Sequence, residues 1–185
     1  MTALRWEWRT FGEQFGRSEE RFDSIEPERS VESDETYLLS ADGVDAVKIR
    51  EGVMDVKRLE QVDDDGLELW KPVMKSPLPI SAPDARAVLA ALRISAALDR
   101  DTYDLADLTR ATGGAVRVVP VHKKRRHFTI ARCMAELTDV RTSDRSTRTI
   151  AIESEEPARV IAAVRELGLH SRPNVNVPLG LRSLL

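Results

Sequence analysis

Basic side chains at alternating positions are the residues of this sequence best suited to chemistry. Lys48 and Arg50 alternate with apolar residues in the run Val47-Lys48-Ile49-Arg50, and Lys123 and Arg125 alternate in a second basic run. Residues two apart on a strand point to the same face, so each pair presents its cations together. Guanidinium and ammonium groups bind phosphate oxygens. The pattern therefore indicates a binding site for a phosphate polyanion.

The first strand carries the same alternation together with a carboxylate. In Leu4-Arg5-Trp6-Glu7-Trp8-Arg9 the apolar residues share one face, which we expect to be buried in the core rather than to stack on nucleic acid bases. Polar residues occupy the other face. Collected over all the expected strands, the polar faces contain seven cations and two carboxylates, namely Arg5, Glu7, Arg9, Lys48, Arg50, Lys57, Lys123, Arg125 and Glu153.

This set of charges has two interpretations. So many cations in one sheet would repel one another unless a polyanion or water separated them, which favours a binding site. The alternative is that each strand shows an ordinary solvated face, as most half-buried sheets do. The binding-site interpretation predicts that the nine charged residues point into one shared concavity, and that Trp6, Trp8, Ile49 and Ile152 point away from it.

Period-two alternation and turn residues predict the elements that position these side chains. Strands are expected at 4–9, 36–40, 47–50, 54–57, 67–71, 116–121, 128–140 and 149–153, and helices at 85–98, 103–109 and 155–167. Residues 12–34 are expected to form a long connection without a readable function. On the second basic run, Lys124 and Arg126 should face outward as a basic stripe that a partner could touch.

Composition narrows the classes of protein to which the chain could belong. The 185 residues, 42% of them hydrophobic, predict one domain that spans residues 1–185. A formal net charge of −3 predicts no membrane partner and no sequence-specific nucleic acid partner. The single cysteine, together with the absence of a signal pattern and of a long apolar run, predicts a cytoplasmic protein. Zinc-ligand spacing, a glycine-rich phosphate loop and a nucleophile elbow are all missing from the sequence.

Short blocks in a fixed order carry a resemblance to a known family. They are Glu7-x-Arg9, Val47-Lys48-Ile49-Arg50, Asp55-Val56-Lys57, Val121-His122-Lys123-Lys124-Arg125, Ala135-Glu136-Leu137-Thr138-Asp139, and Ile150-Ala151-Ile152-Glu153-Ser154 before a helix. In this order the chain resembles the CYTH or triphosphate tunnel metalloenzyme family over nearly its whole length. The resemblance implies an α+β fold, in which a closed or nearly closed antiparallel β-barrel of about eight strands forms a tunnel with helices packed outside.

The resemblance also implies roles for individual residues. Phosphate would be held by Arg5, Arg9, Lys48, Arg50, Lys57, Lys123 and Arg125. A divalent metal would be held by Glu7, Glu153 and Asp139. Glu136 is the alternative to Asp139, because the two residues lie on opposite faces of the expected strand and its register decides which of them points inward. No catalytic residue is assigned.

Two departures from the family pattern affect the metal site. The family opens with Glu-x-Glu-x-Lys where this chain has Arg5-x-Glu7-x-Arg9, and the family's later Glu-x-Glu is here Ala151-x-Glu153. Mg²⁺ and Mn²⁺ prefer several hard oxygen ligands, so either ion is compatible with the site but is not required for binding. Two hypotheses stay open. The chain either binds triphosphate, polyphosphate or a nucleotide with weak or lost catalysis, or it is an active metal-dependent triphosphatase.

Overall fold

The computed structural model describes residues 4–185. The strands are β1 (Arg5–Gly12), β2 (Arg29–Leu39), β3 (Ala46–Arg50), β4 (Val53–Val62), β5 (Glu68–Pro77), β6 (Ile80–Ser81), β7 (Thr102–Tyr103), β8 (Arg117–Ile130), β9 (Cys133–Arg141) and β10 (Ser146–Ser154). The helices are α1 (Arg17–Asp23), α2 (Ala82–Ala91), α3 (Leu105–Ala111), α4 (Pro157–Glu166) and α5 (Val177–Ser183). Among the described residues, no helix has the length and apolar character needed to cross a membrane.

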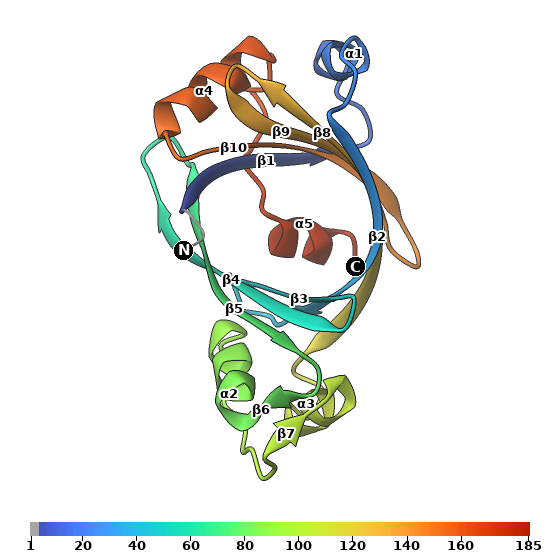
Figure 1. Ribbon diagram of the computed structural model, residues 1–185, viewed down its shortest axis with the longest axis vertical. Helices are drawn as coiled ribbons and strands as arrows, with labels where there is room; N and C mark the ends of the chain where they lie inside the picture. Colours follow the sequence, from blue (N-terminus) through green and yellow to red (C-terminus); the bar gives the residue numbers. More distant parts are fainter. Residues whose placement is uncertain (1–3) are drawn as a thin grey trace.

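Eight of the strands close into an antiparallel barrel, which confirms the expected fold (Figure 1). Around the barrel the order is β1-β10-β9-β8-β2-β3-β4-β5, and the ring closes by pairing β1 with β5. The short strands β6 and β7 form a separate two-stranded sheet. Because side chains alternate along each strand, every barrel strand sends one face inward and one outward.

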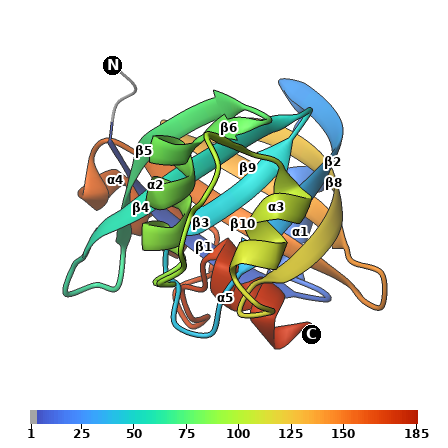
Figure 2. The same ribbon diagram turned by 90° about the horizontal axis from the view of Figure 1, so that it is seen from below.

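The outward faces pack against helices. Helix α4 covers β1, β9 and β10, where Trp8 and Ile152 are buried together with Val160. On the other side of the barrel α2 covers β3 and β4, where Val47 and Met54 are buried with Val88 of the helix (Figures 1 and 2). The apolar strand faces therefore meet helices, and the prediction that Trp8 and Ile152 point away from the interior is confirmed.

Helix α5 differs from the other helices because it lies inside the ring of strands (Figure 1). Its Leu181 is fully buried in a cluster with inward-facing residues of β2, β8 and β9, among them Tyr37, Val119 and Val140. Gly180 lies so close to the Phe11 ring of β1 that even a Cβ atom would overlap it. The helix thus fills one end of the barrel with apolar side chains.

The segment before α5 enters the barrel through the seam between β1 and β5. Pairing of these two strands ends at Glu7, which leaves the backbone of Arg9 free on that side. The Arg9 N–H donates to Asn174 Oδ1 at 2.7 Å, and the Val175 N–H donates to the Arg9 carbonyl at 2.6 Å. Asn174 Nδ2 also donates to the Gly66 carbonyl at 2.8 Å. These bonds satisfy the open edge of β1 and fix the start of α5.

Several element boundaries differ from the expected ones. β8 continues through the second basic run to Ile130, and the chain reverses at Ala131 and Arg132, which have φ of 50° and 63°. The single strand expected over 128–140 is therefore split between β8 and β9. β2 begins at Arg29, inside the expected connection. The helix expected over 85–98 ends at Ala91, because Arg93 has a φ of 55° that no α-helix can continue through.

Candidate functional site

The inward polar faces enclose a cavity of about 420 Å³. Eight of the nine charged residues collected from the sequence line it, namely Glu7, Arg9, Lys48, Arg50, Lys57, Lys123, Arg125 and Glu153. Val177 and Pro178, at the start of α5, also line the cavity and close its floor. The structure therefore brings these side chains into one concavity, as the binding-site interpretation predicted.

Arg5 and Asp139 are not brought into the cavity. The Arg5 side chain is 40% exposed at the rim, with its Nη1 2.7 Å from Met134 Sδ. Asp139 lies on the outer face of β9, where Arg148 Nε donates to it at 2.9 Å. The side chains of β9 alternate, so a register that turns Glu136 inward must turn Asp139 outward. The metal-ligand assignment of Asp139 is thus corrected, and Glu136 is the carboxylate that β9 places inside.

One half of the cavity, formed by β2, β3 and β8, is basic, and at its centre lies a carboxylate that the sequence analysis missed. The Glu35 side chain is fully buried, and the cations lie around it at 2.7 Å (Arg125 Nη2), 3.2 Å (Lys48 Nζ), 3.2 Å (Lys123 Nζ) and 3.7 Å (Arg50 Nη1). The strand was expected to begin at Thr36, so Glu35 lay outside every expected strand, whereas β2 in fact begins at Arg29. We call these five residues the basic cluster.

Burial and charge shift the pKa values in the basic cluster in opposite directions. Burial raises the pKa of Glu35, but Lys123, Lys48 and Arg125 outweigh it and hold that pKa well below its usual range. Burial lowers the pKa of Lys123 to about 7, although Glu35 opposes the shift. Glu35 is therefore ionised at neutral pH, and the charge of Lys123 changes near neutrality.

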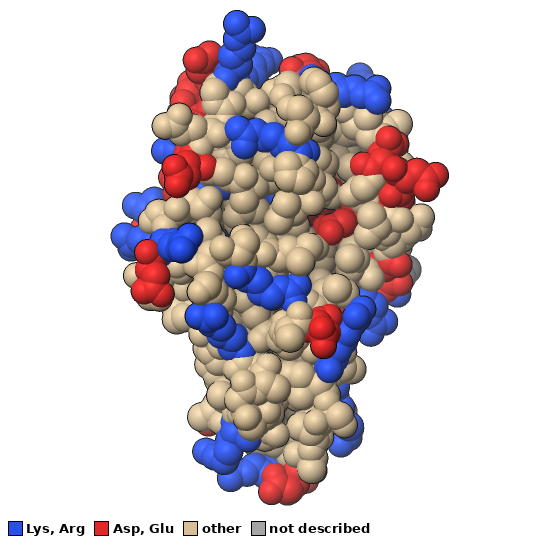
Figure 3. Space-filling view, turned by 180° about the vertical axis from the view of Figure 1, so that it is seen from behind, with Lys and Arg blue, Asp and Glu red and all other residues tan. Residues whose placement is uncertain are grey.

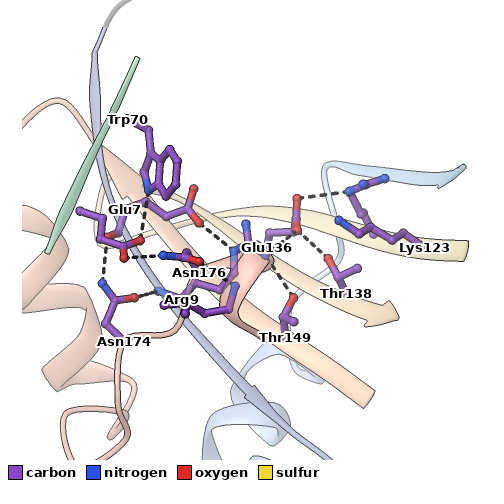
Figure 4. A network of polar contacts seen from close by, with 12 residues as sticks. Glu7, Arg9, Trp70, Lys123, Glu136, Thr138, Thr149, Asn174 and Asn176 are labelled. Carbon is purple, nitrogen blue, oxygen red and sulfur yellow. Dashed lines mark hydrogen bonds and ion pairs between the residues drawn. The ribbon is translucent and has the colours of Figure 1, made fainter. Parts of the chain in front are cut away.

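The opposite wall of the barrel carries a row of three carboxylates. The strand register places Glu7 directly between Glu68 of β5 and Glu153 of β10. Burial raises the pKa of Glu153 to about 7, and the nearby Glu7 adds to that shift. Burial also raises the pKa of Glu68, which accepts hydrogen bonds from the Trp70 indole at 3.2 Å and from Asn176 Nδ2 at 2.8 Å (Figure 4). We call Glu68, Glu7 and Glu153 the carboxylate row.

Arg9 is held by the acidic side of the cavity. Its Nε donates to Glu7 Oε1 at 2.7 Å, and its Nη1 donates to Thr149 Oγ1 at 3.2 Å and to Glu136 Oε1 at 3.5 Å (Figure 4). Thr138 donates to the same Glu136 oxygen at 2.6 Å. Burial would lower the pKa of Arg9, but Glu7 and Glu136 raise it above its usual range. The guanidinium is thus a fixed charge that has carboxylate partners.

Solved structures with the same architecture are known. The candidate adenylate cyclase bh2851 of Bacillus halodurans matches over 100% of both chains, with a TM-score of 0.56 and 13% sequence identity. The candidate adenylyl cyclase HpAC1 of Hippeastrum, which has a dominant triphosphatase activity, matches over 91% of this chain and 89% of its own, with a TM-score of 0.48 and 12% identity. No family model and no curated protein matches the chain. The chain shares its fold with the Bacillus halodurans protein, which is a CYTH-type protein.

The charge balance of the tunnel corrects one expectation from the sequence. Only Glu7 and Glu153 were expected to face the cations, which made the whole cavity positive. The lining also contains the carboxylates of Glu51, Asp55 and Glu136 and the cation Arg29, and the carboxylates of Glu35 and Glu68 are buried in the wall. Positive charge is therefore in excess mainly in the basic cluster, where four cations surround one carboxylate.

Three carboxylates of the tunnel, Glu7, Glu68 and Glu136, are bound by protein donors and in this state do not fit a resident divalent metal. Among residues 4–185, no three His, Cys, Asp or Glu side chains are arranged to hold one ion. Glu7 is bound by Arg9, Glu136 by Arg9 and Thr138, and Glu68 by Trp70 and Asn176. An ion such as Mg²⁺ requires several free oxygen ligands in a near-octahedral arrangement. These carboxylates already accept hydrogen bonds from the protein.

The two cations expected to form an outward basic stripe on β8 have acidic neighbours. Lys124 and Arg126 do face outward, but Lys124 is 3.4 Å from Glu32 and Arg126 is 2.9 Å from Asp23. On the face that Figure 3 draws, basic and acidic side chains are interspersed. The two outward cations are therefore compensated by neighbours, unlike those of the basic cluster.

Proposed function

We propose that this chain binds the phosphate groups of triphosphate, polyphosphate or a nucleotide in its tunnel, with hydrolysis weak or absent. The observation that carries the proposal is the basic cluster, in which two lysines and two arginines surround a single carboxylate and line the cavity. Lys48, Lys123 and Arg125 are largely buried, and an excess of buried positive charge is costly unless an anion binds it. Phosphate oxygens match these donors in charge and geometry.

Weak hydrolysis is inferred from the acidic side of the cavity. Water attack on a phosphoanhydride generally needs a metal ion to offset charge and position the nucleophile. Of the carboxylates that could bind such an ion, Glu7 is engaged by Arg9, and Glu68 is engaged by Trp70 and Asn176. We therefore expect binding without efficient turnover.

An active triphosphatase is the second candidate function. The carboxylate row favours it, because Glu68, Glu7 and Glu153 lie on adjacent strands across the tunnel from the basic cluster. If a ligand released these carboxylates from their present partners, they could bind a metal ion. Metal-dependent phosphate release that Glu7→Gln abolishes would establish this function instead of the first.

Thermal melting with a panel of ligands tests the proposal. The panel contains triphosphate, polyphosphate, ATP and orthophosphate, each in EDTA, Mg²⁺ or Mn²⁺, with phosphate release measured in the same mixtures. A ligand that binds only the native state raises its melting temperature. We expect stabilisation by triphosphate in EDTA, a smaller effect of orthophosphate and little phosphate release. No stabilisation by any of these anions would refute the binding function.

A further inference from the structure

Glu35 lies behind the cations that it contacts. Its side chain has no exposed surface, whereas Lys48, Arg50, Lys123 and Arg125 all line the cavity. Tyr37 extends the contacts, because its hydroxyl donates to Glu35 Oε2 at 2.9 Å and accepts from Lys123 Nζ at 2.6 Å. The carboxylate therefore belongs to the wall, and the ammonium and guanidinium groups lie between it and the cavity.

The position of Glu35 reduces the repulsion among the four cations of the basic cluster. Four cations within a few ångströms repel one another, and in a buried site the repulsion is poorly screened. Long side chains under such repulsion spread apart, or a lysine loses its proton. A carboxylate at the centre draws all four toward one point. The carboxylate offsets only one of the four positive charges, so the basic cluster retains net positive charge that can bind an anion.

We propose that Glu35 is the positioning residue of the phosphate site, and that it holds Lys48, Lys123 and Arg125 together with their charged groups toward the cavity. The inference rests on the proposed function only in naming phosphate as the ligand. The positioning itself is a property of the ligand-free protein, so it can be tested separately.

The protonation of Lys123 reports on this role. The groups that face Lys123 are Glu35 and Tyr37 of β2, Lys48 of β3, Arg125 of β8, Arg9 of β1 and Glu136 of β9. Burial lowers the pKa of Lys123, the cations lower it further, and Glu35 is the strongest group acting to raise it. Removing the charge of Glu35 should therefore lower the pKa of Lys123 below its wild-type value of about 7, so that the lysine is mostly neutral already at pH 7.

A competing account gives Glu35 the opposite effect on binding. If the carboxylate occupied the place of a phosphate group, it would compete with the ligand, and its removal would tighten binding. In the positioning account its removal weakens binding. The loss is largest above pH 7, where the ligand binds the protonated minority of Lys123 and a lower pKa makes that minority smaller. The sign of the effect separates the two accounts.

The test compares wild type with Glu35→Gln, Glu35→Asp and the control Glu32→Gln, which removes an outward carboxylate of the same strand. NMR of ¹³C-labelled lysine gives the titration midpoint of Lys123 without ligand, and calorimetry gives triphosphate affinity in EDTA at pH 6 and pH 8. For Glu35→Gln we expect a midpoint lower by about one pH unit. Affinity at pH 8 should fall about tenfold or more, with a smaller loss at pH 6. Glu32→Gln should match wild type.

Each outcome decides between the accounts. Tighter binding by Glu35→Gln at both pH values, or an unchanged Lys123 midpoint, would overturn the positioning role. If Glu35→Gln does not fold, Glu35→Asp is measured in its place, because aspartate keeps the negative charge but has a shorter side chain. It should bind triphosphate more weakly than wild type, and equality with wild type in both measurements would overturn the proposal. Failure of wild type to bind triphosphate, with the midpoint shift intact, would refute the proposed function alone.

Discussion

At the scale of single residues, burial sets the charges in the tunnel as much as residue type does. Lys123 and Glu153 both have pKa values near 7, although their unperturbed values differ widely. Desolvation is the largest cause for each, and it disfavours the charged form of both groups. The neighbouring charges then differ in their effect, since Glu35 supports the charge of Lys123 whereas Glu7 opposes the charge of Glu153. Near pH 7, small changes in pH should therefore alter the charge of both walls.

The raised pKa of Glu153 predicts a pH-dependent effect on stability. The folded pKa of about 7 exceeds the ordinary 4.5, so the stabilisation from the proton is fully present below about pH 4.5 and is lost as pH rises through 7. Glu153→Gln mimics the protonated form. It should raise the free energy of unfolding at pH 8 by about 1–2 kcal/mol, and change it little at pH 5.

Denaturant unfolding at the two pH values measures this effect. Glu155→Gln, which removes an exposed carboxylate two residues away, serves as the control and should show no dependence on pH. Equal effects of Glu153→Gln at pH 5 and pH 8 would show that Glu153 is ionised in the folded protein at both.

At the scale of elements, α5 closes the floor of the cavity through a contact that requires glycine. Gly180→Ala would place a methyl group within the Phe11 ring, so either the helix or the ring must move. We expect the substitution to lower the free energy of unfolding by about 1–3 kcal/mol, despite the higher helix propensity of alanine. Denaturant unfolding measures this loss. In a Phe11→Leu background the loss should be smaller. If Gly180→Ala lowers the free energy of unfolding equally in wild type and in Phe11→Leu, the Phe11 ring is not the cause of the loss.

Alternation within a strand made much of the cavity predictable. Once Val47–Arg50 and the run at Lys123 are recognised as strands, period two decides which cations share a face, and those cations do line the cavity. The carboxylates were harder to place. Glu35 lies one residue before the strand expected at 36–40, and Glu68 lies within the strand expected at 67–71 but shares its face with Trp70 and not with a cation. The choice between Glu136 and Asp139 depends on the register of β9 against its neighbours. Register is set by long-range pairing, which short sequence patterns do not contain.

The position of α5 inside the barrel could also not be predicted from local sequence patterns. The tail contains Val177, Leu181 and Leu184, which is typical of any packed helix. Whether such a helix covers a barrel from outside or fills it depends on the space that the inward side chains leave. Here Tyr37, Val119 and other inward residues make one end of the barrel apolar. The same alternation that indicated a polar cavity gave no sign that it ends at a helix.

At the scale of the whole molecule, the cavity is closed at the α5 end. A linear phosphate chain must therefore enter from the other end, and a cavity of about 420 Å³ holds only a short terminal part of a long chain. If binding occurs in the tunnel, a linear polyphosphate should bind at most two protein molecules, one at each end, whatever its length. Calorimetric stoichiometry with chains of defined length measures this. A stoichiometry that grows with chain length would place binding on the outer surface.

The central claim is that buried cations of the tunnel bind triphosphate without a metal. Arg125 and Arg126 are adjacent on β8, but Arg125 faces the cavity and Arg126 pairs with Asp23 outside, so they form a matched pair. The direct measurement is calorimetric titration of triphosphate, in EDTA, into wild type, Arg125→Ala and Arg126→Ala. We predict binding by wild type, a loss of about tenfold or more in Arg125→Ala, and near wild-type affinity in Arg126→Ala. Binding that appears only with Mg²⁺, or equal losses in the two variants, would contradict the claim.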